Sequence, residues 1–133
     1  MKGSYCIIIK ILSPFNAKIS NKKIHFKKGY YVYIGSALNS LEKRIERHLK
    51  IKKKKHWHID YLLEKRNVKI EKIFIKESKI KEECKIARKI LEIGKPIKNF
   101  GSSDCSCISH LIKINKIKIK NILKKEGFSV FRF

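Results

Sequence analysis

One stretch, YVYIGSALNSLEKRIERH (residues 31–48), decides the fold, because the spacing of its apolar side chains changes along it. Its first part, Tyr31–Ile34, consists of aromatic and β-branched residues, which are typical of a strand. From Leu41 to His48 the apolar positions recur every three or four residues, which gives a helix with one inward face. Gly35 lies between the two patterns and allows a sharp turn and the close approach of a ligand. We therefore predict a strand that leads directly into a helix.

Further elements are predicted on both sides of this unit. Tyr5–Leu12 is a short apolar run rich in β-branched residues, so we expect a buried strand that pairs with Tyr30–Ile34 through an irregular connection. Ile70–Ile75 alternates apolar and charged side chains, which indicates a half-exposed strand. The remaining expected elements are helices near His56–Leu63, Ile80–Ile93 and Lys116–Lys125, and strands at Ile24–Phe26, Ser109–Ile114 and Phe128–Phe133.

These elements mix strands and helices without strict βαβ order, which predicts an α+β fold. We expect a small antiparallel or mixed sheet with about three central strands, flanked by helices. The chain has 133 residues, the size of one domain, so we expect a single domain over residues 1–133.

The charge balance indicates a polyanionic partner. The chain has 34 Lys and Arg against 11 Asp and Glu, a net charge of +23. Such an excess opposes the compact state by self-repulsion, and a polyanion would relieve it by releasing counterions. A bias in base composition that favours both Lys and Ile accounts for part of this charge. Nucleic acid is the expected partner.

No membrane partner is expected. No run of apolar residues is long enough to span a bilayer, and no segment reads as a basic amphipathic helix with an aromatic face. The first five residues lack the order of basic, apolar and small residues that marks a signal peptide. We therefore expect a cytoplasmic protein, and we make no prediction of its oligomeric state.

The strand-to-helix unit brings together groups that suit phosphodiester chemistry. Tyr31 and Tyr33 share one face of the strand, and Arg44 and His48 share one face of the helix. Arg44 could hold a phosphate through two hydrogen bonds, and His48 could donate to phosphate or carry a proton. The alternative is a core hairpin of packed tyrosines beside a solvated basic helix, and spacing alone does not separate the two interpretations.

Three motifs together resemble the GIY-YIG nuclease superfamily. They are Gly3-Ser4-Tyr5, Tyr33-Ile34-Gly35 and Leu41-x-x-Arg44-Ile45-x-x-His48. The superfamily includes homing endonucleases and the N-terminal nuclease domain of the excision-repair enzyme UvrC. The match covers residues 3–48 and extends more loosely to Pro96. The rest of the chain is similar to a largely archaeal branch of that superfamily.

The resemblance implies a role for each matching residue. Tyr33 becomes the general base, which requires nearby cations because a free phenol has a pKa near ~10. Tyr5 positions water or phosphate, and Arg44 stabilises the transition state. Glu83, with Glu82 as the alternative, binds one divalent ion, Mg²⁺ or Mn²⁺. Residues beside these groups are expected to contact nucleic acid, namely Gly35, Ser36, Lys43 and Arg47.

The sequence departs from the superfamily pattern at several positions. Ser4 stands where the superfamily name has Ile, and Ser36 follows the second tripeptide, where the repair nucleases carry Lys. One extra residue separates the second tripeptide from Arg44. Glu83 lies further from Pro96 than is usual in the superfamily, so the metal ligand is the residue most affected by these departures.

A second cluster, Cys105-x-Cys107-x-x-His110, leaves two interpretations open. It could bind zinc, and the fourth ligand would then be Cys84, His56 or His58. The spacing differs from the Cys-x-x-Cys that commonly begins a zinc site, so we prefer reduced, buried thiols in a tight loop beside the site.

The roles of Asp104 and His58 are left open by the sequence, whereas Trp57 has one expected place. Asp104 lies in a loop and could pair with Lys or Arg, reach the metal or orient a histidine. His58 could support the site as an accessory group, although at most one of His56 and His58 can face it at this spacing. Trp57 is expected in the core rather than as a surface on which bases stack.

Together these observations predict a metal-dependent endonuclease that hydrolyses phosphodiester bonds in nucleic acid. The resemblance favours DNA, and RNA stays open. The alternative is a non-catalytic nucleic-acid-binding module that retains the nuclease fold, which the charge of +23 and the absence of Lys at Ser36 would also suit. Substrate structure and sequence preference are not predicted.

Overall fold

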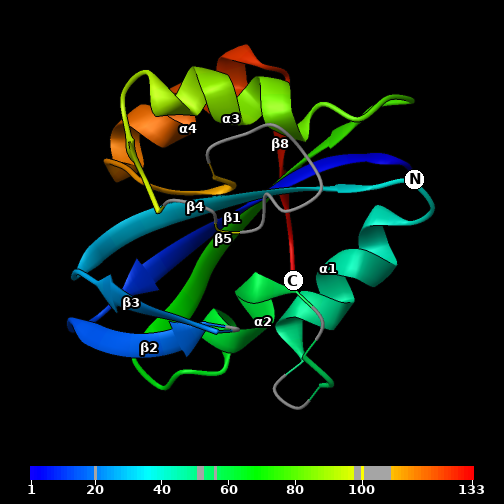
Figure 1. The fold of residues 1–133 in the computed structure, drawn as a ribbon. Coiled ribbons are helices and arrows are strands. Elements are labelled where there is room, and N and C mark those ends of the chain that lie inside the picture. The colour runs from blue at the N-terminus through cyan, green and yellow to red at the C-terminus, as the bar shows by residue number, and fades with distance from the viewer. Residues whose placement is uncertain (20, 51–52, 56, 98–99, 101–108) are drawn as a thin grey trace.

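The chain folds into an antiparallel sheet that lies between two layers of helices (Figure 1). The computed structural model describes residues 1–19, 21–50, 53–55, 57–97, 100 and 109–133. The strands are β1 (Gly3–Ile11), β2 (Phe15–Ile19), β3 (Lys22–Phe26), β4 (Gly29–Ala37), β5 (Val68–Glu77), β6 (Lys95–Pro96), β7 (Leu111–Lys113) and β8 (Ser129–Phe131). The helices are α1 (Leu41–Leu49), α2 (His58–Leu63), α3 (Glu83–Leu91) and α4 (Lys116–Lys125).

The main sheet has six strands in the order β6-β7-β4-β1-β5-β8, and each neighbouring pair is antiparallel. The predicted α+β class and the pairing of β1 with β4 are therefore confirmed. The expectation of about three central strands was too small. The short strands β7 and β8 lie within the predicted strands Ser109–Ile114 and Phe128–Phe133 and extend the sheet on both sides. Only β6, which has two residues, was not predicted, because it is too short to give an alternating pattern. The connection between β1 and β4 is a separate two-stranded sheet, β2-β3.

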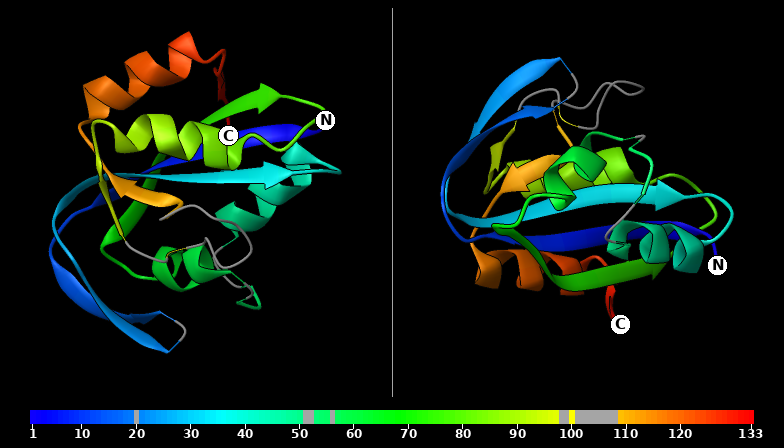
Figure 2. Two further views of the ribbon diagram at one scale, coloured as in Figure 1. Left: turned by 45° about the horizontal axis from the view of Figure 1, so that its top comes forward. Right: turned by 90° about the horizontal axis from the view of Figure 1, so that it is seen from below.

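The central strand β1 is buried on both faces, which explains its continuous apolar sequence. Tyr5, Ile7 and Ile9 pack on the side that carries α1, α2 and the β2-β3 sheet. Cys6 and Ile8 pack on the opposite side, against α3 and α4. Successive side chains of a strand alternate between the two faces, so this one strand supplies both cores. Figure 2 shows the two helical layers on either side of the sheet.

The helices differ from their predicted bounds only at the ends. α1 begins after Ser40, whose hydroxyl accepts a hydrogen bond from the Lys43 backbone. α3 begins at Glu83 rather than near Ile80, because Ser78 binds both backbone groups of Ile80 in a local turn that competes with helix. α4 has the predicted bounds. Within the described residues, no helix has the length and apolar character needed to cross a membrane.

Candidate functional site

A pocket of about 580 Å³ lies beside the end of β4. Its walls come from β1, β4, α1, the start of α2, the start of α3 and the residue before β7. Nine residues that the sequence singled out line it: Tyr5, Tyr33, Gly35, Ser36, Lys43, Arg44, Arg47, Glu83 and His110. The fold thus brings distant residues together: Tyr5 and Glu83 are 78 positions apart in the sequence (83 − 5 = 78), yet both line this pocket.

The two tyrosines meet because of the register between β1 and β4. Tyr5 is opposite Gly35, and Ile7 is opposite Tyr33, so the tyrosines are diagonal neighbours on one face. Their ring centroids are 6.4 Å apart. Tyr33 is 6% exposed and Tyr5 is 1% exposed, so each presents little more than an edge to the pocket.

Gly35 has a different role from the one predicted. It does not form a turn, because it lies within β4. The Tyr5 ring covers it so closely that a Cβ at this position would lie 2.4 Å from the Tyr5 hydroxyl oxygen. Glycine is therefore required here for the packing of a tyrosine across the strand pair, and a larger residue would displace that ring.

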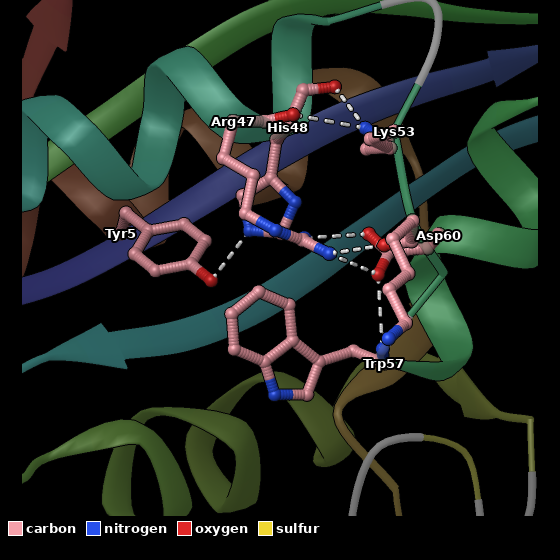
Figure 3. Close-up of polar contacts among 7 residues, drawn as sticks. Tyr5, Arg47, His48, Lys53, Trp57 and Asp60 are labelled. Carbon is pink, nitrogen blue, oxygen red and sulfur yellow. Dashed lines mark hydrogen bonds and ion pairs between the residues drawn. The ribbon is translucent and has the colours of Figure 1, made fainter.

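His48 lies behind Tyr5 rather than in the pocket wall. Its Nε2 is 2.8 Å from the Tyr5 hydroxyl, and the residue is only 2% exposed (Figure 3). Burial, reinforced by the Lys53 ammonium, lowers the pKa of His48 to about 3, and burial raises the pKa of Tyr5 to about 12. Both groups are therefore neutral at pH 7. The expectation that His48 donates directly to a phosphate does not fit this position; it instead holds the Tyr5 hydroxyl.

The buried His48 makes stability depend on pH. Unfolded histidine has a pKa near ~6.5, so below that pH the unfolded state binds a proton that the folded state takes up only near pH 3. We expect the free energy of unfolding to decrease as the pH falls, by about 2 kcal/mol between pH 7 and pH 5 from this residue alone. Urea titrations of wild type and of His48→Gln at both pH values measure it, and the variant should lose markedly less.

The exposed His25 gives the matched control for this pH dependence. It hydrogen-bonds the Asn16 side chain at 2.7 Å on the surface of the β2-β3 sheet. His25→Gln should keep the full wild-type decrease. A His48 ring signal that titrates between pH 5 and pH 8 in NMR spectra would contradict the assignment.

Arg44 is the cation that the fold orients most directly toward the tyrosines. Its Nη1 donates to the Ser36 carbonyl at 3.0 Å, which ties α1 to the end of β4. Its guanidinium carbon lies 4.4 Å from the centroid of the Trp57 ring. Its charge opposes the rise in the pKa of Tyr5 that burial causes. Arg44 is therefore held from two sides within reach of both the Tyr5 hydroxyl and the pocket.

Arg47 lines the same pocket but is engaged by a buried acid. Its two terminal nitrogens donate to the two carboxylate oxygens of Asp60 at 3.0 and 2.9 Å (Figure 3). One of them also donates to the Lys54 carbonyl at 2.8 Å. Asp60 is fully buried and accepts in addition from the Trp57 backbone N–H at 2.9 Å. Arg47 therefore holds the wall of the pocket together as well as contributing a cation to it.

Trp57 was expected in the core, and its half-buried ring packs against the core cluster. The same ring also lines the pocket, which the sequence interpretation did not predict. The guanidinium carbons of Arg44 and Arg47 each lie 4.4 Å from its ring centroid, a distance at which cations are attracted to an indole. Two arginines three positions apart on α1, followed by a tryptophan, were the available signal. Lys81 is a second lining residue that no motif indicated.

The two candidate metal ligands have different surroundings. Glu83, the first residue of α3, lines the pocket and accepts a hydrogen bond from the Ser36 hydroxyl. Glu82 does not line it and instead pairs with Lys76 at 3.2 Å. A carboxylate is also favoured at the start of a helix by the helix dipole. Of the two, only Glu83 is placed to reach a ligand that also contacts Arg44.

The pocket carries a strong positive charge. Four cationic side chains line it, from Lys43, Arg44, Arg47 and Lys81, and Glu83 is the one acid among the described lining residues. Asp60, behind the wall, offsets the charge of Arg47. Walls of low dielectric strengthen such a field. The arrangement can hold an anion with several charges, such as a phosphate, beside a single carboxylate.

The second cluster is described only in part. His110 lines the pocket, and its Nε2 is 3.7 Å from the Cys84 sulfur. Asp104, Cys105 and Cys107 lie outside the described residues, as does His56. His58 does not line the pocket and contacts the Phe100 ring, with centroids 5.6 Å apart. Within the described residues, no three metal-ligating side chains gather. Cys84 is disulfide-bonded, so the expectation that it could complete a zinc site is wrong, because a disulfide sulfur offers no thiolate to the metal. For Cys105 and Cys107 the choice between zinc and reduced thiols stays a prediction.

A family model described as a domain of unknown function, DUF123, matches residues 4–130. The chain belongs to the DUF123 family. The matched DUF123 region includes Tyr5, Tyr33, Arg44 and Glu83, and so contains the whole pocket as well as both helical layers. No curated protein and no solved structure gave a match.

Proposed function

We propose that this protein is a metal-dependent endonuclease of the GIY-YIG type that hydrolyses phosphodiester bonds in nucleic acid, with DNA favoured. One observation carries the proposal. Tyr5, Tyr33, Arg44 and Glu83 come from four different elements and line one pocket. These are the four residues to which the resemblance in sequence assigns catalytic or metal-binding roles. A cytoplasmic location stays a prediction.

The residues beside Glu83 suit a magnesium-like ion. Mg²⁺ prefers oxygen ligands and is commonly held by one or two carboxylates, with waters and substrate phosphates as the other ligands. The Glu83 carboxylate and the Ser36 hydroxyl that bonds to it are donors of that kind. When bound there, such an ion supplies positive charge that stabilises the leaving oxygen.

The chain's own residues then account for the other requirements of hydrolysis. Arg44 neutralises charge that develops on the phosphate. Tyr33, as phenolate, takes a proton from the attacking water, whose oxygen bonds to phosphorus as the bond to the leaving oxygen breaks. Four cationic side chains line the same pocket as Tyr33. Tyr5 has a pKa of about 12 and stays protonated, so it acts as a hydrogen-bond donor rather than as a second base.

Cleavage assays with matched variants test the proposal. Wild type is incubated with single-stranded, double-stranded and branched substrates in the presence of Mg²⁺ or Mn²⁺. We expect cleavage that Tyr33→Phe and Glu83→Ala both abolish. The controls are Tyr31→Phe, which removes a hydroxyl bonded to the Lys27 carbonyl, and Glu82→Ala, which removes an ion pair outside the pocket. Wild type that cleaves no better than the two site variants would sink the proposal.

The second candidate is a nucleic-acid-binding module without catalysis. Ser36 stands where the repair nucleases of the superfamily carry Lys, and its hydroxyl is bound to Glu83, which favours this alternative. Binding should then weaken steeply with salt because the contacts are electrostatic. Variants in the pocket should change the affinity without changing the rate of any chemical step. An affinity that does not depend on salt concentration would contradict this candidate.

A further inference from the structure

A second pocket, of about 630 Å³, lies at the opposite end of β4 from the site described above. Four lysines from four separate segments line it. Lys27 precedes β4, Lys95 lies in β6, Lys113 lies in β7 and Lys116 begins α4. No acidic side chain is among the described residues that line this pocket. The fold therefore gathers ammonium groups around one hollow.

Most of this charge is uncompensated within the described structure. Lys116 pairs with Glu71 outside the pocket lining. Lys27, Lys95 and Lys113 form no ion pair with any residue that the structure describes. Like charges so arranged repel one another, and a bound anion removes that cost.

The β3-β4 turn is shaped to admit one of these ammonium groups. Gly29 has φ 140°, a conformation that residues with side chains rarely adopt. A Cβ there would also lie 3.2 Å from the Lys113 nitrogen. The backbone amides at the start of α4 are already bound by the Asn115 side chain. Recognition in this pocket therefore falls to the lysine side chains rather than to the helix end.

The size and position of the pocket indicate what the anion is. The hollow is far larger than one phosphate requires, and its lysines are spread around it. Tyr30 lines this pocket and Ser36 lines the first, six residues apart on β4 (36 − 30 = 6). At ~3.3 Å per residue the two lie roughly 20 Å apart, a span that nucleic-acid backbone can cover, because a duplex carries one phosphate charge per ~1.7 Å of its axis.

We propose that this second pocket binds the phosphodiester backbone of the nucleic acid whose scissile phosphate occupies the first pocket. The inference takes its partner from the proposed function but does not require cleavage. Lysine contacts to backbone phosphates carry no sequence information, so the second pocket fixes the position of the strand and leaves sequence preference unchanged.

A salt titration tests this inference without any cleavage. The triple variant Lys27→Ala, Lys95→Ala, Lys113→Ala and wild type are titrated with a fluorescent duplex of about 20 bp in EDTA, from about 50 to 200 mM NaCl. Each phosphate contact contributes about 0.9 to the slope of log K against log salt, so the variant should lose about 2.7 of slope. Circular dichroism and urea unfolding confirm that the variant remains folded.

The β2-β3 sheet supplies a control of equal charge. Lys18→Ala, Lys22→Ala, Lys23→Ala removes three exposed lysines that line neither pocket, and it should lose less than about 1 of slope. Equal losses in both triple variants would overturn the inference, as would a wild type that does not bind the duplex. Inorganic phosphate at constant ionic strength should leave the difference intact; if it abolishes the difference, the pocket takes free phosphate instead.

The outcomes separate this inference from the proposed function. Binding with the expected loss of slope, but no cleavage with Mg²⁺ or Mn²⁺, keeps the second pocket and removes the nuclease. Cleavage that depends on Tyr33 and Glu83, together with equal slopes for the two triple variants, supports the nuclease and rules out the role of the second pocket.

Discussion

Asp60→Ala should lower the free energy of unfolding by about 3–5 kcal/mol, a large fraction of the stability of a single small domain. Asp60 is fully buried and accepts from both terminal nitrogens of Arg47 and from the Trp57 backbone. Its removal leaves a partly buried cation and an N–H without their acceptor, which is the costly way to break a buried pair. Urea unfolding at pH 7 measures the loss.

Two further variants show whether the charge of Asp60 is the cause. Asp60→Asn keeps one oxygen that can accept from the Trp57 N–H, but it loses the charge and the second acceptor for Arg47, so it should fall between wild type and alanine. Glu64→Ala removes an acid that is 39% exposed and pairs with Lys55 on the surface, and should change stability by less than about 1 kcal/mol. If Asp60→Ala lowers the free energy of unfolding no more than Glu64→Ala does, the hydrogen bonds of Asp60 to Arg47 and Trp57 do not stabilise the wall of the pocket.

Arg44→Ala should reduce the rate of cleavage by about 10²–10³-fold, the usual cost of removing one donor to a developing oxyanion. The affinity for nucleic acid should fall much less. The Arg44 contact strengthens only in the transition state, whereas the other cations of the pocket still bind the uncleaved substrate. Single-turnover rates with saturating enzyme, beside binding measured in EDTA, separate the two quantities. This prediction depends on the proposed function.

Arg44→Lys should not restore the rate. The guanidinium both donates to the Ser36 carbonyl and lies over the Trp57 ring, and an ammonium group cannot match that planar geometry. Lys43→Ala is the control, since Lys43 is an exposed neighbour in the same pocket. It should weaken binding in a salt-dependent way and leave the rate at saturation close to wild type. Equal losses of rate from Lys43→Ala and Arg44→Ala would show that Arg44 acts only as bulk charge.

Local patterns predicted those parts of the structure that depend on near neighbours in the chain. The apolar, β-branched and aromatic composition of β1 and β4 predicted their strands, and the helical spacing after Ser40 predicted α1. The convergence of Tyr5, Tyr33, Arg44 and Glu83 was expected from the resemblance, which assigns these four residues to one site.

Features that depend on contacts between distant segments were not predictable in this way. The requirement for Gly35 follows from the register that sets it opposite Tyr5, which the residue itself does not reveal. Glu83 was preferred to Glu82 from the resemblance alone; that Glu82 instead pairs with Lys76 from β5 was not predictable from the sequence. The position of Trp57 follows from the contact between α1 and the start of α2. That contact exists because both helices pack on the same face of the sheet.

The double burial of β1 limits how the length of this chain can vary. Odd-numbered residues of β1 serve one core and even-numbered residues serve the other, so inserting or deleting one residue would exchange them. The Tyr5 ring would then turn toward α3, and the small Cys6 side chain would take its place beside His48. The β2-β3 sheet lies outside the main sheet and contributes buried side chains to one of the two cores only. Differences in length between this chain and other chains of its family should therefore fall between residues 12 and 28 and not within β1.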